Sequence, residues 1–324
     1  MAPEIEAFIR KATDATEMVV LEEIQSLWSG YGKILRIALK GYEKKTLVLK
    51  HVRFPTIESH PRGWNTNISH ERKVKSYQIE KYFYENYSDQ CHDFVRVPKC
   101  IAVGMEGEDS FMLLEDLDDA GYPERRVSAT KSDIKACIAW LAHFHVLFLN
   151  EEPKGLWKTG TYWHLETRPD ELEQLSDQKL KNAAQVIDKT LKESPFQTWV
   201  HGDAKIANFC FSDKNKKVAA VDFQYVGGGC GMKDLAYFIG SCLDENECEL
   251  QEKILLDFYF DQVREASKKL SRKIDVKALE ENWRSLYPVA WADFHRFLKG
   301  WSPGHWKLNH YSERLSQEVI EALS

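Results

Sequence analysis

The sequence lacks a paired-cysteine motif, a long hydrophobic run and an internal repeat. Its seven cysteines form no C-x-x-C pair and are odd in number, so we expect reduced thiols and no disulfide framework. The most apolar stretch, Ile134–Leu149, contains one lysine and two histidines and is too short to cross a bilayer. No period of roughly 20–50 residues recurs, which excludes solenoids and propellers.

A large excess of one charge is also missing. The chain has 44 basic and 50 acidic residues, a formal net charge of −6 at pH 7. A slightly acidic protein has no general attraction to nucleic acid or to anionic membranes. The first turns carry Glu4, Glu6, Arg10 and Lys11 with no apolar signal region. We therefore expect a cytoplasmic protein with neither a nucleic-acid nor a membrane partner.

The chain has enough apolar material for a sizeable core. It is 43% hydrophobic and 12% aromatic, which excludes wholesale disorder. Its 324 residues predict two domains or one domain with two lobes.

Hydrophobic patterning divides the chain into a strand-rich and a helical part. In the first part the patterns predict strands over 35–39, 46–52, 99–104 and 110–114 and a helix over 69–87. The segment 117–130, with its aspartates, glycine and proline, is the predicted linker. Beyond it, helices are predicted over 132–149, 170–192, 233–243, 247–270 and 276–300. We expect an α+β fold with an N-terminal lobe of residues 1–117 and a C-terminal lobe of residues 118–324.

One segment carries residues suited to metal-assisted phosphoryl transfer. It reads His-Gly-Asp-Ala-Lys-Ile-Ala-Asn over 201–208 and is followed by a short hairpin and Val-Asp-Phe-Gln over 221–224. Such chemistry needs one carboxylate near the attacking hydroxyl, and a second carboxylate with an amide oxygen to hold magnesium. Asp203, Asn208 and Asp222 are of the right types for these three roles.

This segment resembles the catalytic and metal-binding loops of the protein-kinase-like fold. The similar version occurs in aminoglycoside phosphotransferases, choline kinases and the ecdysteroid-kinase-like family, where the first loop reads His-Gly-Asp. The resemblance implies a bilobal kinase-like fold, Asp203 as catalytic base, and Asn208 and Asp222 as magnesium ligands. Lys205 matches a lysine of protein serine/threonine kinases that neutralises the transferring phosphate, and is taken as a second catalytic residue.

The resemblance also implies an ATP site in the N-terminal lobe. Lys50 ends the run Leu-Val-Leu-Lys and is similar to the kinase lysine that binds the α- and β-phosphates. Glu80, on the following helix, is its expected ion-pair partner, and Glu71 is the alternative.

Two further segments are similar to nucleotide-binding parts of that fold. Ser29, Gly30 and Gly32 resemble a reduced glycine-rich loop. The strand that ends in Glu115 and leads to Leu117 is similar to a hinge. There the carbonyl of Glu115 and the N–H of Leu117 would bind adenine, in a register that can shift by one residue.

The C-terminal third is rich in aromatic residues, and in small-molecule kinases this region builds much of the substrate pocket. The residues expected to form its wall are Trp291, His295, Trp301 and Trp306. Aromatic faces suit an ammonium group or a flat apolar alcohol. The stretch 283–306 offers one carboxylate, Asp293, which makes a polycationic aminoglycoside a poorer fit.

The sequence thus predicts an ATP- and Mg²⁺-dependent phosphotransferase that acts on a hydroxyl of a small-molecule alcohol. Two alternatives stay open. One is a nucleotide-binding pseudokinase that acts as an interaction module, which the thin glycine loop favours. The other is a protein kinase, which Lys205 suggests, although no Ala-Pro-Glu follows Asp222.

Overall fold

The computed structural model describes residues 3–27, 30–53, 67–107, 109–212 and 217–323. The chain divides into two compact units, which we describe one at a time. The first unit comprises Met1–Glu124 and Cys210–Val221, and the second Arg125–Phe209 and Asp222–Ser324. The predicted lobe boundary after residue 117 stays a prediction.

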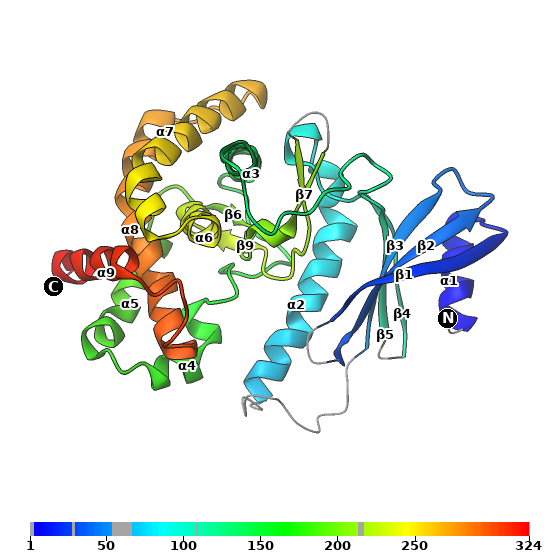
Figure 1. Cartoon of the computed structure of the whole chain (residues 1–324), viewed down its shortest axis with the longest axis horizontal. Coiled ribbons are helices and arrows are strands. Elements are labelled where there is room, and N and C mark those ends of the chain that lie inside the picture. The colour runs from blue at the N-terminus through cyan, green and yellow to red at the C-terminus, as the bar shows by residue number, and fades with distance from the viewer. Residues whose placement is uncertain (1–2, 28–29, 54–66, 108, 213–216, 324) are drawn as a thin grey trace. The chain divides into compact units, whose positions relative to one another are not determined.

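The first unit is built on a five-stranded antiparallel sheet (Figure 1). Its strands are β1 (Glu17–Ser26), β2 (Gly32–Lys40), β3 (Thr46–Val52), β4 (Cys100–Glu106) and β5 (Asp109–Glu115), in the order β1-β2-β3-β5-β4. Two helices, α1 (Pro3–Thr13) and α2 (Asn67–Asn86), lie on opposite faces of this sheet. Single turns of 3-10 helix follow α2 at Ser88–Gln90 and Asp93–Val95.

Alternation along β3 gives the two faces of the sheet different roles. Leu47 and Leu49 have no exposed surface and pack with Ile5 and Ile9 of α1. Because successive side chains of a strand point to opposite faces, Lys50 and its neighbours at even positions face α2. The same strand therefore supplies core residues on one side and a buried cation on the other.

The four predicted strands and the helix predicted over 69–87 are present, but α1 and β1 were not predicted. Strand β1 is an edge strand that pairs with β2 alone, and nine of its ten residues are exposed. It therefore lacks the alternation of buried and exposed positions by which a strand is recognised. Val19, Leu21 and Ile24 are apolar residues that it leaves exposed.

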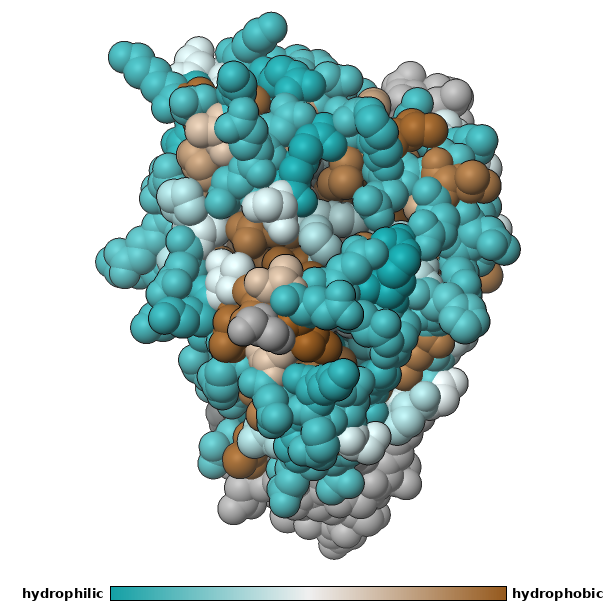
Figure 2. All heavy atoms as spheres, turned by 90° about the vertical axis from the view of Figure 1, so that its left-hand side faces the viewer, coloured by the Kyte–Doolittle hydropathy of each residue, from teal (hydrophilic) through white to brown (hydrophobic). Residues whose placement is uncertain are grey.

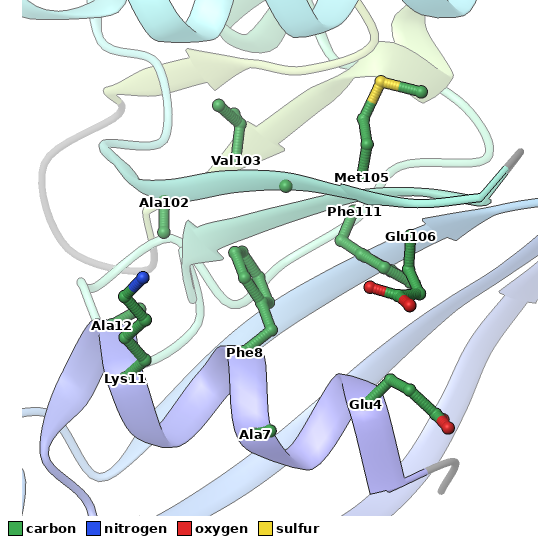
Figure 3. Close-up of a pocket in the computed structure, with 11 residues that line it drawn as sticks. Glu4, Ala7, Phe8, Lys11, Ala12, Ala102, Val103, Met105, Glu106 and Phe111 are labelled. Carbon is green, nitrogen blue, oxygen red and sulfur yellow. The ribbon is translucent and has the colours of Figure 1, made fainter.

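A groove of about 630 Å³ lies between α1 and β4 (Figure 3). Phe8 and Phe111 meet across its floor with ring centroids 5.8 Å apart. None of the residues predicted for function lines it.

The second unit is mainly helical. Its helices are α3 (Lys131–Leu147), α4 (Pro169–Gln174), α5 (Gln178–Lys192), α6 (Met232–Cys242), α7 (Glu245–Lys269), α8 (Val276–Trp301) and α9 (His310–Leu323). Strands β6 (Thr198–Val200) and β9 (Gly227–Gly229) pair antiparallel, and single 3-10 turns lie at Leu165–Thr167 and Ile206–Asn208. A second short pair, β7 (Phe209–Phe211) and β8 (Val218–Ala220), follows the candidate catalytic loop, and its residues from Cys210 onward belong to the first unit. The α+β fold class is confirmed.

One predicted helix is two, and one helix was not predicted. The stretch 170–192 breaks between α4 and α5, where Asp177 caps α5 by accepting a hydrogen bond from the N–H of Leu180 at 3.1 Å. An Asp at this position is a helix start signal that the long apolar pattern concealed. Helix α9 follows a turn in which the Asn309 side chain accepts from the N–H of Ser312.

The outer face of the second unit that carries α7 to α9 is mostly hydrophilic, with apolar side chains scattered over it (Figure 2). Among the residues that the structure describes, no helix is both long and apolar enough to span a membrane.

Candidate active site

The loop after β6 is held in one conformation by a glycine and a buried carboxylate. Gly202 has φ +82°, and a Cβ there would lie 2.1 Å from the carbonyl oxygen of Tyr225, so only glycine fits. Asp234, at the start of α6, accepts the backbone N–H groups of His201 and Gly202 at 2.5 and 2.9 Å. Asp234 therefore fixes the backbone of the two residues that precede Asp203.

Asp203 is the centre of a hydrogen-bonded group. Its Oδ1 accepts from the hydroxyl of Tyr237 at 2.9 Å. Its Oδ2 accepts from Lys205 Nζ at 3.0 Å and from the side-chain amide of Asn208 at 3.1 Å. The carboxylate is thus oriented by three donors while Asp203 keeps 7% of its surface exposed.

Lys205 remains charged beside this carboxylate. Burial lowers the pKa of Lys205, but the charges of Asp203 and Asp222 outweigh burial and raise the pKa above its ordinary value. A permanent positive charge next to Asp203 suits the stabilisation of a transferring phosphoryl group.

Asn208 and Asp222 provide oxygen atoms of the kind that magnesium prefers. The Asn208 amide nitrogen donates to the backbone oxygen of Asp203 at 2.8 Å and to its carboxylate. Its amide oxygen accepts no hydrogen bond from any residue in the described part of the chain. Asp222 has φ +69°, a left-handed conformation that costs a non-glycine residue about 1–3 kcal/mol and is found at functional sites. An amide oxygen and a carboxylate fit a hard cation such as Mg²⁺.

In the first unit, Lys50 is paired with Glu80. The Lys50 Nζ contacts both carboxylate oxygens, at 2.9 and 2.6 Å, and the two residues are 4% and 2% exposed. Glu71, the alternative partner, forms no ion pair with any described residue. The amine also lies 5.5 Å from the ring centroid of Tyr77, which comes from the same helix as Glu80.

The two described glycines of the reduced glycine-rich segment differ in their surroundings. Gly30 has φ +75° and no described residue within 4 Å of where a Cβ would be, so there is open space beside its Cα. Gly32 has φ +120°, and a Cβ would lie 2.0 Å from the carbonyl oxygen of His51, so this glycine is required by the β2–β3 pairing. Ser29, the third predicted residue of this segment, lies outside the described residues.

The predicted hinge begins at the end of β5. Glu115 pairs with Leu47 of β3, three residues before Lys50. Its carboxylate contacts Arg96 at 2.5 Å and accepts the N–H of Lys99 at 3.2 Å, which fixes the strand end. The N–H of Leu117 donates to no residue in the described ranges, so it is available to an acceptor such as adenine.

Two of the four residues predicted to form the substrate wall, Trp301 and Trp306, lie near His305, with ring centroids 6.3 and 5.9 Å from that of the histidine. Trp291 and His295 are 2% and 1% exposed and lie inside the helical core, where His295 Nε2 contacts Glu313 at 3.0 Å. Helix α8 is buried on several sides, so these two side chains face other parts of the same unit. Aromatic spacing in the sequence does not show which side of such a helix meets solvent. Trp301 stacks on Phe297 with centroids 5.7 Å apart, and Trp306 is 60% exposed.

Three residues near Asp203 were not predicted from the sequence. Tyr237 lies one helical turn after Asp234 on α6, a spacing that could have indicated a shared face. Tyr162 meets Tyr237 edge to face with centroids 5.6 Å apart. Lys307 places its amine 4.7 Å from the Tyr237 ring centroid. Tyr162 and Lys307 come from irregular segments, where no periodicity could have placed them.

A histidine and two carboxylates form a different cluster in the second unit. The potential ligand atoms of these residues, His164, Glu166 and Asp188, all lie within 4.8 Å of one another, which is close enough to share a metal ion. Lys192 Nζ contacts Glu166 and Asp188 at 2.9 Å each, so an ammonium group already neutralises these carboxylates. We interpret this cluster as an ion-pair network.

Comparisons with known proteins agree with the predicted resemblance. The model of the ecdysteroid kinase-like family matches residues 148–272, which include Asp203, Asn208 and Asp222. The amicoumacin kinase hAmiN, solved in complex with AMP-PNP, Ca²⁺ and Ami, has a TM-score of 0.53 and 14% identity over 100% of this chain and 96% of its own. A microcompartment-associated aminopropanol kinase has a TM-score of 0.50 and 13% identity over 99% of this chain and 94% of its own.

No curated protein matches the chain. The family match and the solved structures confirm the kinase-like fold of small-molecule phosphotransferases that the sequence predicted.

Proposed function

We propose that this protein is an ATP- and Mg²⁺-dependent phosphotransferase that phosphorylates a hydroxyl group of a small molecule. The observation that supports it best is the arrangement of Asp203, whose two oxygens are oriented by Tyr237 on one side and by Lys205 and Asn208 on the other. This is the environment that a base for an attacking hydroxyl requires, since the carboxylate is oriented by hydrogen bonds and lies next to a positive charge.

In the proposed reaction, the acceptor hydroxyl donates a hydrogen bond to the Asp203 carboxylate. The carboxylate orients the hydroxyl and takes its proton as the oxygen attacks the γ-phosphate, and the bond from that phosphorus to ADP breaks. Lys205 offsets negative charge on the moving phosphoryl group. Most of the rate enhancement would then come from positioning and electrostatics.

Asn208 and Asp222 are the residues that would hold Mg²⁺, and the bound ion would neutralise phosphate charge. In the first unit, Lys50 is the proposed ligand of the α- and β-phosphates, held by Glu80. Gly30, Gly32, Glu115 and Leu117 are proposed to contact the nucleotide through their backbones.

The protein-kinase alternative receives no support from the chain after Asp222. In protein kinases a long activation segment follows the metal-binding aspartate. Here β9 begins at Gly227 and α6 at Met232, so ordered structure starts five residues after Asp222.

The test is transfer of the labelled γ-phosphate of ATP to a fractionated small-metabolite extract. We expect the wild type to form a labelled product and Asp203→Asn to form it about 10²–10⁴-fold more slowly, because a positioned general base contributes about that much. Asp244→Asn is the matched control, since Asn can replace Asp as the N-cap of α7.

Three outcomes would argue against the proposal. Equal product from wild type and Asp203→Asn would remove Asp203 from the reaction. ATP binding without product in either protein would favour the pseudokinase. Failure of the wild type to bind ATP would contradict the nucleotide assignment altogether.

A further inference from the structure

The amine of Lys307 occupies an aromatic environment close to the candidate catalytic base. Lys307 lies in the turn between α8 and α9, where its backbone oxygen accepts the hydroxyl of Ser312 at 3.0 Å. Its Nζ lies 4.7 Å from the ring centroid of Tyr237 and 5.5 Å from those of Phe294 and Trp306. The residue keeps 9% of its surface exposed, so a ligand has a narrow approach to it.

Apart from these ring contacts, the amine has no polar partner in the described part of the chain. It forms no hydrogen bond or salt bridge with any of the residues that the structure describes, although an ammonium group has three donors. Burial lowers the pKa of Lys307 to about 8, even though the charge of Asp203 acts in the opposite direction. The charge of Asp203 therefore does not outweigh burial, and the three donors of the amine are available to a ligand.

Lys307 and Asp203 are linked through one side chain. The ring of Tyr237 faces the Lys307 amine, and the hydroxyl of the same residue donates to Asp203 Oδ1 at 2.9 Å. On its other oxygen, Asp203 is bound by Lys205. An acceptor whose hydroxyl reaches Asp203 on the Tyr237 side would thus place its neighbouring atoms near Lys307.

We propose that the Lys307 amine donates a hydrogen bond to an oxygen atom of the acceptor beside the hydroxyl that is phosphorylated, and so selects acceptors with an oxygen, not an ammonium group, at that place. This inference rests on the proposed function, because it takes Asp203 as the group that receives the reacting hydroxyl.

Charge on the neighbouring helix agrees with this selectivity. An ammonium group beside Lys307 would need a carboxylate to offset the repulsion between two cations. Asp293 of α8 cannot supply one, because it has no exposed surface and is neutralised by Lys233 at 3.3 Å and Arg296 at 2.8 Å. An oxygen acceptor, by contrast, would supply the hydrogen bond that the amine lacks.

The test uses wild-type protein and needs no ATP. Pyridoxal 5′-phosphate is the probe: an unprotonated lysine amine adds to its aldehyde and releases water, and sodium borohydride reduces the imine to a stable secondary amine. Peptide mapping after brief labelling near pH 8 then gives the extent of modification at Lys307. Lys253, whose side chain is 85% exposed, is the internal control for general lysine reactivity.

Protection of Lys307 is then measured with three alcohols on the same phenyl body: mandelate, 1-phenylethane-1,2-diol and (2-hydroxy-2-phenylethyl)trimethylammonium, whose quaternary nitrogen cannot react with the probe. We expect mandelate and the diol to protect Lys307 at concentrations at least about tenfold lower than the ammonium alcohol, with labelling of Lys253 unchanged. Absence of label at Lys307, protection by none of the three, or equal protection by the ammonium alcohol would overturn the proposal. Because no phosphoryl transfer is involved, this result is independent of whether the proposed reaction occurs.

Discussion

Each of the two units contains a buried lysine, and the two lysines differ in what surrounds the amine. Lys50 in the first unit contacts both oxygens of Glu80. Lys307 in the second unit has aromatic rings around its amine and no hydrogen-bond partner among the described residues. Both residues are at least nine-tenths buried.

The difference shows how a charge can be buried for two purposes. A buried ion pair with good geometry offsets most of its own desolvation, so Lys50 is held rigidly in one place. An amine that is mostly buried and has no polar partner among the described residues has its donors available to a ligand, as we propose for Lys307.

The largest effect is expected from breaking the pair. Lys50→Met leaves the Glu80 carboxylate buried and uncompensated, which costs about 3–5 kcal/mol of unfolding free energy. Urea denaturation at pH 7 measures it. The double variant Lys50→Met/Glu80→Gln should recover at least half of the loss, because no charge is then left alone. A double variant no more stable than the single one would mean that the pair is not the cause.

Removing the unpaired lysine should have the opposite sign. The pKa of Lys307 is about 8 against an ordinary value of 10.5, and each of these roughly 2.5 units corresponds to about 1.4 kcal/mol. Loss of cation–π contacts offsets part of this gain. We therefore expect Lys307→Met to raise the unfolding free energy at pH 7, measured by urea denaturation, by about 1–3 kcal/mol. A less stable variant would make Lys307 a structural residue.

That gain should depend on pH in one direction. Between pH 8 and 10.5 the unfolded chain binds more protons at Lys307 than the folded chain, so the wild type gains stability as the pH rises. The advantage of the Met variant should therefore shrink from pH 7 to pH 10. The other groups that act on the amine are Asp203, Lys205, Cys242 and Cys248, and burial raises the pKa of the two thiols to about 11 and 12. A constant difference in urea denaturation across this range would contradict the assignment.

The smallest effect is expected at Trp306. Its ring contacts the Lys307 amine at 5.5 Å but is 60% exposed, so Trp306→Ala should change stability by no more than about 0.5 kcal/mol. Trp301→Ala should cost more, because that ring stacks on Phe297. Thermal denaturation of the two variants gives the comparison, and a reversed order would show that the exposed ring carries the packing.

Much of the fold could be predicted, because its elements have strong local signals. Strand β3 was predicted with its observed bounds from a run of apolar residues between charged turns. The predicted bounds of α6 differ from the observed ones by one residue at each end. Strand β1 was not predicted, since an edge strand with both faces exposed has no alternation to detect. The break before α5, at Asp177, was missed for a different reason: the apolar spacing continues across it.

The candidate site likewise contains residues that local patterns identify and residues that they misplace. Asp203, Asn208 and Asp222 were selected from residue type and spacing, and their catalytic and metal-binding roles remain predictions. Trp291 and His295 were chosen by the same reasoning, yet they lie in the interior of the second unit. A helix surrounded by others is aromatic on several sides, so composition alone does not distinguish a core residue from a pocket residue.

The sequence by itself determined the fold class, the resemblance to small-molecule kinases and the order of the candidate groups along the chain. These follow from local patterning and from motif residues whose spacing is fixed by one loop and one hairpin. Only the tertiary structure decided that Glu80 pairs with Lys50 and that Tyr237 and Lys307 lie beside Asp203. Those contacts join residues at least thirty positions apart, and their energies depend on burial and on which side chains face each other, which a linear pattern does not contain.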